Sequence, residues 1–103
     1  MLLLFLKTRT GNYDAKAEYD DGRMIVKKGS RVSLQLASHI RGGRKAKSYL
    51  DDRSYVNDMG IVIQDCEFKS PSTAAQFVTG NSANGYLVWK DKNGIKLKEL
   101  IKK

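Results

Sequence analysis

Apolar and charged residues alternate near the start of the chain, and this pattern predicts a β-hairpin. In the segment YDAKAEYD, residues 13–20, every second position is tyrosine or alanine and the positions between them carry charge. A period of two is typical of a strand with one face buried and the other in water. Asp21-Gly22 follows at once and favours a two-residue turn. This turn gathers the apolar residues on one side, with Tyr19 opposite Met24 and Ala17 opposite Val26.

Apolar runs predict further strands. We expect Leu2–Leu6 to be a buried strand with both faces covered. This run is too short and wrongly flanked for a secretory signal, and it falls far below the roughly 20 apolar residues that span a bilayer. Ile61–Ile63 is expected to be extended as well. Residues 32–36 alternate and favour an extended segment, although Leu36 and Ile40 would also suit a helix.

The segment from Ser70 to Gly80 carries the start and stop signals of a helix. Ser70 can cap the helix, and Pro71 suits its first position because proline gives up only an amide that would be unpaired there. Gly80 is the expected C-cap. A second, short amphipathic helix is predicted from Lys45 to about Arg53 by the spacing of its apolar residues.

The last quarter of the chain predicts a second hairpin. Asn84-Gly85 leads into a strand at Tyr86–Lys90, and a three-residue turn of Lys92, Asn93 and a left-handed Gly94 is expected to close it. We favour this turn over a two-residue one because it places the apolar residues of both strands together. Those residues are Leu87, Trp89, Ile95 and Leu97. Residues 98–103 are expected to form a short helix or a frayed basic tail.

These elements predict an α+β fold, with antiparallel β-hairpins packed against two or three short helices in a single domain, residues 1–103. A chain of 103 residues buries enough surface for one core without disulfide or metal staples. The lone cysteine, Cys66, excludes an internal disulfide framework and predicts a reducing, cytoplasmic location. The lone histidine, His39, argues against a histidine-based metal site or catalytic triad.

The positive charge of the chain is concentrated in one segment. The net charge is +8, and the residues between Gly22 and Leu50 hold eight bases and no acid, whereas eleven bases balance eleven acids elsewhere. Concentrated positive charge attracts polyanions and speeds encounter with them. The eight bases are Arg23, Lys27, Lys28, Arg31, Arg41, Arg44, Lys45 and Lys47.

Several short motifs together resemble a known family. They are S-P-S-x-A-A at 70–75, G-N at 80–81, N-G-x-x-x-W-K at 84–90, D-x-x-G at 91–94, A-K-A-E-Y at 15–19 and V-x-K-G-S at 26–30. The set resembles domain of unknown function family 4357, from roughly Leu4 to Leu100. The resemblance implies a C-terminal domain of GIY-YIG-type nucleases and restriction-modification-linked proteins, similar to a module suspected of reading modified DNA such as methylated adenine. It implies no catalytic residues.

Three groups of residues are candidates for contact with nucleic acid. The basic segment could neutralise phosphates through Lys27, Lys28, Arg31, Arg41, Arg44, Lys45 and Lys47, the alternative being a solvated face or pairing with Asp51, Asp52 or acids elsewhere. At the start of the 71–79 helix, Ser70, Ser72 and Thr73 could hold an anion, the alternative being capping alone. Trp89 could stack on a base beside Lys90 or else pack in the core, and Asn84 could read an adenine edge or else form a turn.

No motif for catalysis is present. The carboxylate pairs Asp20-Asp21 and Asp51-Asp52 lack the convergent spacing of a metal-dependent nuclease, and phosphate-binding glycine loops and dinucleotide fingerprints are missing. We therefore expect a non-catalytic DNA-binding accessory module that uses no cofactor, metal, membrane or small-molecule substrate. Its expected context is a homodimer or a larger parent protein. The alternative is a protein-interaction or homodimerisation module that docks an acidic partner, because an open edge at Leu2–Lys7 would invite pairing.

Overall fold

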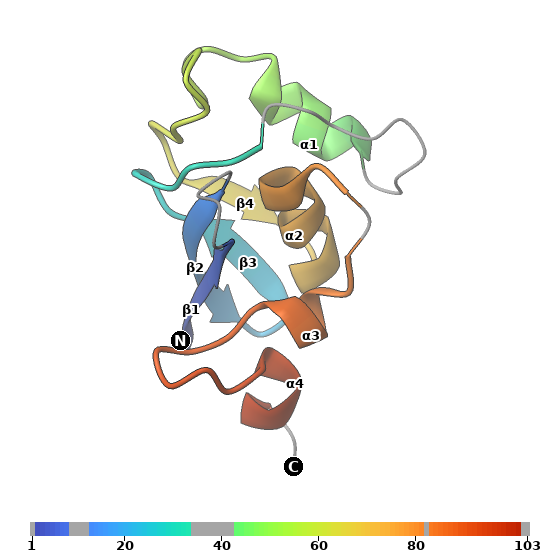
Figure 1. The fold of residues 1–103 in the computed structure, drawn as a ribbon. Helices are drawn as coiled ribbons and strands as arrows, with labels where there is room; N and C mark the ends of the chain where they lie inside the picture. The colour runs from blue at the N-terminus through green and yellow to red at the C-terminus, as the bar shows by residue number, and fades with distance from the viewer. Residues whose placement is uncertain (1, 9–12, 34–42, 82, 102–103) are drawn as a thin grey trace.

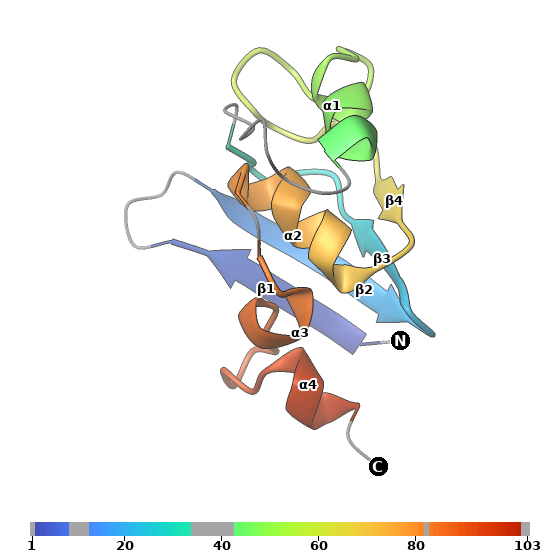
Figure 2. The same ribbon diagram turned by 90° about the vertical axis from the view of Figure 1, so that its right-hand side faces the viewer.

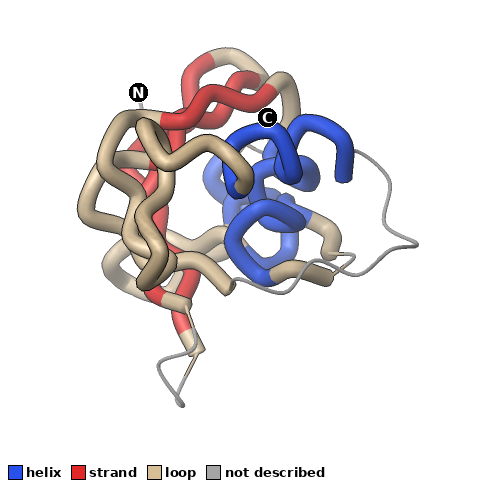
Figure 3. The backbone as a smooth tube through the Cα atoms, turned by 90° about the horizontal axis from the view of Figure 1, so that it is seen from above, coloured by secondary structure: helices blue, strands red, loops and turns tan. Residues whose placement is uncertain are grey.

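The computed structural model describes residues 2–8, 13–33, 43–81 and 83–101, and it has the predicted α+β fold. Four antiparallel strands form one sheet in the order β1-β2-β3-β4 (Figure 1). The helices lie on one side of the strands, as the view from above shows (Figure 3). The strands are β1 Leu2–Lys7, β2 Asp14–Asp20, β3 Arg23–Val26 and β4 Cys66–Phe68. The helices are α1 Gly43–Leu50, α2 Pro71–Thr79, α3 Gly85–Val88 and α4 Leu97–Leu100.

The hairpin of β2 and β3 has the predicted register. Tyr19 pairs with Met24, and Ala17 pairs with Val26. Asp21 and Gly22 both have positive φ, 50° and 91°, which is the backbone of the tight turn that matches strand twist. On the inward side Ala15, Ala17, Met24 and Val26 are buried and Tyr19 is partly buried, so the alternation in the sequence does report which face meets the core.

Strand β1 forms where the apolar run predicted it, but the expectation that both its faces are covered is wrong. Leu4 and Leu6 are buried, whereas Leu3 is 48% exposed. The helices that the structure describes lie over one face of the sheet, so alternate side chains of β1 point away from them. The outer edge of β1 is paired at Phe5, whose N–H donates to the carbonyl of Lys90 over 2.7 Å and whose carbonyl accepts the N–H of Lys90 over 3.1 Å.

A bulge follows β3 at the V-x-K-G-S motif. The N–H of Lys27 still bonds the carbonyl of Lys16, but the next paired residue of this segment is Arg31, opposite Asp14. Gly29 has a φ of 93°, and the buried hydroxyl of Ser30 accepts from the N–H of Lys16 over 3.0 Å and donates to its carbonyl over 3.2 Å. The hydroxyl thus supplies the acceptor for the Lys16 N–H that the bulge removes from the ladder.

Helix α2 has the caps that the sequence predicts. The hydroxyl of Ser70 accepts from the N–H of Thr73, Pro71 occupies the first position, and Gly80 closes the helix with a φ of 76°. Figure 2 shows α2 lying across the sheet. Its buried face includes Ala74, Phe77 and Val78, and these side chains cover the strands at the centre of the core.

The predicted strand at Tyr86–Lys90 is wrong, because residues 85–88 form helix α3. Asn84 caps it by accepting from the N–H of Tyr86 over 3.0 Å. The three-residue turn is confirmed: Asp91 N–H donates to Ile95 O, and Gly94 has a φ of 82°. Of the four apolar residues expected on one buried face, Trp89 and Leu97 are fully buried, but Leu87 and Ile95 are more than 40% exposed.

The remaining local expectations are met in part. Helix α1 spans Gly43–Leu50, so it begins earlier and ends earlier than the predicted 45–53. Ile61 and Val62 form isolated bridges and not a full strand. Residues 34–36 lie outside the described residues. Helix α4, Leu97–Leu100, realises the helical alternative for the C-terminal segment. Within the described ranges, no helix combines the length and the apolar character needed to cross a membrane.

Gly85 sits where α3 meets α2, and substitution there tests this contact. A Cβ on Gly85 would overlap the carbonyl group of Pro71 and the amide of Ser72, which are backbone atoms that cannot swing aside. Gly85→Ala is expected to lower the free energy of unfolding by about 3 kcal/mol, the upper range for overpacking. Urea denaturation measures this change. Gly94→Ala is the control, because its Cβ meets open space and the cost is limited to the left-handed backbone, about 1–2 kcal/mol. Equal losses in the two variants would contradict the α2–α3 contact.

Ser30→Ala tests the bulge. Removing the hydroxyl leaves the N–H of Lys16 without its partner in a part-buried position, which should cost about 1–3 kcal/mol of unfolding free energy. Ser48 is exposed on α1, so Ser48→Ala should change the stability by less than about 0.5 kcal/mol. Thermal or urea unfolding of both variants measures these changes. Equal losses of stability in Ser30→Ala and Ser48→Ala would show that the Ser30 hydroxyl does not stabilise the bulge.

Candidate nucleic-acid interface

The basic segment from Arg23 to Lys47 does not form one surface. Arg23, beside the β2–β3 turn, lies 3.7 Å from Asp20 and 3.6 Å from Glu67. Lys47 lies on α1, with its Nζ 2.8 Å from Asp51. The turn and α1 lie at opposite ends of the sheet (Figure 1). Arg23 and Lys47 thus pair with nearby acids, which is the alternative to phosphate contact that the sequence left open.

Lys27 is also committed to internal pairing. Its Nζ lies 2.8 Å from Asp65 and 3.3 Å from Glu18, and its side chain is half-buried. The hydrogen bond with Asp65 raises the pKa of Lys27 above its usual 10.5. The same bond, together with the N–H of Lys28, holds the pKa of Asp65 below its usual 3.8. This cluster fixes the loop at 65 to the start of the bulge, so Lys27 is poorly placed to hold a phosphate.

Three other predicted cations cannot be placed. Arg41 lies outside the described residues, and so do the side chains of Arg44 and Lys45.

The start of α2 is used within the fold. Ser70 accepts from the N–H of Thr73, and the Thr73 hydroxyl donates to the carbonyl of Ser70 over 3.0 Å. Ser72 accepts from the N–H of Gly85 over 3.0 Å. Pro71 is buried, and its carbonyl accepts from the indole of Trp89 over 3.0 Å. The hydroxyls predicted as anion donors therefore cap α2 and join it to α3.

Two further predicted contacts have structural roles. Trp89 is fully buried, so its ring cannot stack on a base, and its core alternative is the one observed. The side-chain oxygen of Asn84 caps α3, which is the turn role weighed for it. Without an exposed ring at Trp89, the idea of a modified-base reader loses the aromatic on which it relied.

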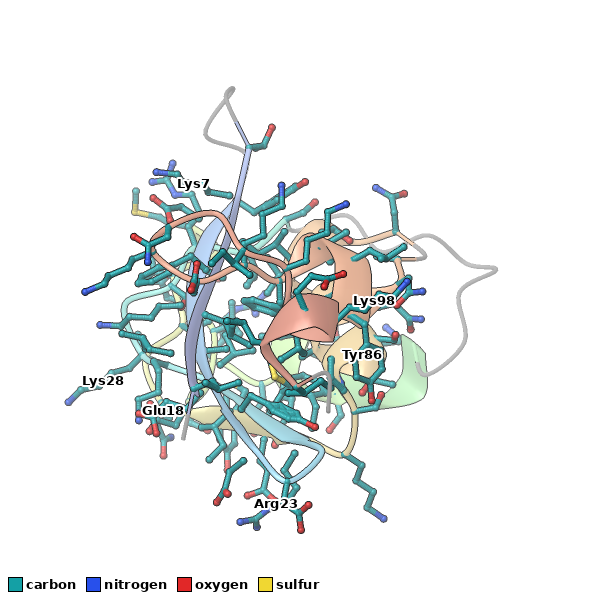
Figure 4. All side chains as sticks on the ribbon, turned by 90° about the horizontal axis from the view of Figure 1, so that it is seen from below. Lys7, Glu18, Arg23, Lys28, Tyr86 and Lys98 are labelled. Carbon is teal, nitrogen blue, oxygen red and sulfur yellow. The ribbon has the colours of Figure 1, made fainter. Side chains whose placement is uncertain are left out.

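The remaining predicted cations, Lys28, Arg31 and Lys90, are exposed on the face of the sheet opposite the helices. Cross-strand pairing places Arg31 and Lys90 in two rows, because directly paired residues project from the same face. One row runs Lys7, Asp14, Arg31, Ile61, and the other runs Lys96, Lys90, Phe5, Lys16. In Figure 4 the labelled Lys7 and Lys28 lie on this side, whereas Tyr86 and Lys98 lie on the helical side.

We call this surface the cationic face. It carries six exposed cations, none of which forms an ion pair within the described residues: Lys7, Lys16, Lys28, Arg31, Lys90 and Lys96. Asp14 is the one acid in the two rows. Neighbouring strands lie about 4.8 Å apart, so a row of four paired residues spans about 15 Å. An unpaired cluster of this kind focuses a positive potential over its surface.

The next row along the sheet bounds the cationic face. It runs Leu3, Glu18, Ile25, Glu67, with two acids and two aliphatic residues. Glu18 and Glu67 approach Lys27 and Arg23. Charge on this side of the sheet is therefore separated. The two rows of the cationic face carry the excess of positive charge, and the third row carries acids that lie close to Lys27 and Arg23.

The cationic face is hollowed in two places. The first hollow has a volume of about 590 Å³ and is lined by Phe5, Asp14, Lys16, Lys28, Gly29, Ser30, Arg31 and Ile61. The second has a volume of about 580 Å³ and is lined by Lys16, Lys27, Lys28, Tyr55, Ile63, Gln64 and Asp65. Lys16 and Lys28 line both, so the hollows adjoin. Their walls carry hydrogen-bond donors and apolar side chains.

Sequence reasoning missed Lys7, Lys16, Lys96 and Phe5 as members of this surface. Lys16 could have been found, because it is a polar position of the strand whose register was predicted correctly. The others depend on the pairing of β1 with β2 and on the bridge between Phe5 and Lys90. Among the described residues, no three or more His, Cys, Asp or Glu side chains are grouped to hold a metal ion.

Fold and surface together define a small α+β domain with a cationic sheet face. The family model described as a domain of unknown function (DUF4357) matches residues 4–101, so the chain belongs to that family. No curated protein and no solved structure matches the chain.

The Asp65 cluster predicts how stability depends on pH. The pKa of Asp65 is lowered in the folded state, so its contribution is present above the usual value of 3.8 and is lost as the pH falls through the lowered one. The pKa of Lys27 is raised, so its contribution is lost only as the pH rises above 10.5. Asp65→Asn should therefore lower the free energy of unfolding at neutral pH, with a deficit that shrinks below pH 3.8.

Urea denaturation across this pH range measures the effect. Asp58→Asn is the control, because it breaks an exposed pair with Arg53 that should be worth no more than about 1 kcal/mol. A deficit for Asp65→Asn that is the same at acid and neutral pH would show that its carboxylate charge does not stabilise the fold.

Proposed function

We propose that this domain is a non-catalytic DNA-binding accessory module that contacts the phosphate backbone through its cationic face. The observation that carries the proposal is the set of six exposed cations without ion pairs in the described structure, gathered on one side of the sheet. Lysine and arginine side chains that neutralise phosphates release counterions, and this release supplies affinity that falls as salt rises.

The cationic face replaces the basic segment of the sequence as the proposed contact surface. Three of its members, Lys28, Arg31 and Lys90, come from the sequence-based set, and the hydrogen-bonded network of the sheet holds the backbone beneath them. A rigid sheet presents the cations at fixed positions, so less ordering is needed on binding. An association with nucleases or restriction-modification proteins is part of the proposal on the ground of the family resemblance alone.

A homodimer through the edge of β1 has less support. Phe5, at the middle of that edge, already exchanges both main-chain hydrogen bonds with Lys90. An acidic protein partner remains compatible with the cationic face, and the experiment below separates it from DNA.

Binding of labelled duplex DNA, followed by fluorescence anisotropy between about 50 mM and 200 mM salt, tests the proposal. Log affinity should fall linearly with log salt. The double variant Lys16→Gln/Lys90→Gln should reduce the slope by about 1.8, from about 0.9 for each phosphate contact. The matched control is Arg23→Gln/Lys47→Gln, which removes the same charge from cations already paired with acids. This control should leave the slope nearly unchanged.

Two results would overturn the proposal. One is no binding at low salt, and the other is an equal loss in both double variants, because that would show a response to net charge and not to the cationic face. Polyglutamate serves as a competitor, and its displacement of DNA at equal charge concentration would favour the acidic protein partner.

A further inference from the structure

The cationic face differs from a plain phosphate-binding surface because its hollows contain aromatic and aliphatic side chains. Phe5 and Ile61 line the first hollow together with Lys16, Lys28 and Arg31. Phe5 is half-buried and stands directly opposite Lys16 on β2. Its main-chain N–H and carbonyl both bond Lys90 on one side, and β2 lies along its other side in the register of the sheet. Its ring is thus carried by a backbone that is fixed at both edges.

The second hollow repeats this arrangement beyond the shared lysines. Tyr55 and Ile63 line it, and Ile63 is one of the exposed large apolar residues of the domain. The carboxylate of Asp65 in its wall forms an ion pair with Lys27 and accepts a hydrogen bond from the N–H of Lys28. Along the surface, Phe5 is therefore followed by a pair of lysines and then by Tyr55, whose partly buried ring also packs edge-on against Tyr49.

This order of groups discriminates between forms of DNA. A duplex presents phosphates outward and keeps its bases stacked inside, so it would leave the apolar floor of both hollows facing water or phosphate. A single strand exposes base faces that can cover Phe5, and its phosphates can meet the lysines between the hollows. Each hollow, at about 590 and 580 Å³, lies within the range of ligand pockets, roughly 300–1,000 Å³.

Building on the proposed function, we infer that the cationic face binds single-stranded DNA in preference to duplex. One base lies over Phe5, the adjoining phosphate lies between Lys16 and Lys28, and the strand continues toward Tyr55. The role that sequence reasoning gave to Trp89 thus passes to Phe5, the aromatic residue that the fold places beside exposed cations.

Affinities for oligodeoxythymidine and for a duplex of equal length, measured at one salt concentration, test this inference. The wild-type protein should bind the single strand at least about tenfold more tightly than the duplex, because base stacking adds to the phosphate contacts. Phe5→Leu keeps the apolar bulk of the side chain and removes the π-face. It should weaken single-strand binding by about 5- to 100-fold and leave duplex binding unchanged.

Tyr86→Leu is the matched control, because Tyr86 is an exposed aromatic on the helical side (Figure 4). It should change neither affinity. Equal or tighter binding of the duplex, or a Phe5→Leu variant with unchanged single-strand affinity, would overturn the inference while leaving duplex binding as proposed. Absence of salt-dependent binding to either form would overturn the proposed function itself.

A cross-linking measurement on the unaltered protein does not depend on the folding of any variant. A single strand containing 5-bromodeoxyuridine is irradiated with the protein, and the cross-linked peptides are identified by mass spectrometry. Cross-links in the peptides that contain Phe5 or Tyr55 support the inference. Cross-links located only at Tyr86 itself would overturn it; the residue must be identified because cleavage after lysine leaves Tyr86 in one peptide with Lys90 of the cationic face.

Discussion

Coverage of one sheet face only is the constraint on which the rest of this structure depends. Helix α2 covers the inward rows of β2, β3 and β4, and alternation along each strand then sends the intervening residues away from the core. Lysines at those outward positions cost little free energy of folding, because their charged groups stay in water. The burial of Ala15 and Ala17 and the exposure of Lys16 between them are thus two results of one packing arrangement.

Local sequence signals predicted local structure well. The tight turn at Asp21-Gly22, the caps at Ser70 and Gly80 and the left-handed Gly94 each depend on a few neighbouring residues, and all were predicted correctly. The strand predicted at 86–90 failed for a non-local reason. Gly85 must approach the backbone of Pro71, and the short helix α3 that follows brings the Trp89 indole to the Pro71 carbonyl.

The candidate surface was less predictable than the fold. Density of bases along the chain indicated residues 23–47, but it carried no information on which acids would lie nearby in space. Arg23 and Lys27 meet acids from β4 and the loop before it, far away in sequence. The rows of the cationic face require five separate pairings: β1 with β2, Asp14 with Arg31, Arg31 with Ile61, Phe5 with Lys90, and Lys90 with Lys96. Of these, the sequence pattern specifies only the last, through the turn predicted at 92–94.

The pairing of Phe5 with Lys90 has a consequence for folding in the cell. An exposed edge strand is a template for intermolecular β-pairing and aggregation. Here the segment that shields the edge of β1 emerges from the ribosome after most of the sheet, so the nascent domain passes through a stage with an unprotected apolar strand at Leu2–Lys7. The lysine that closes the edge also places a charge there, which discourages a second copy from docking in its place.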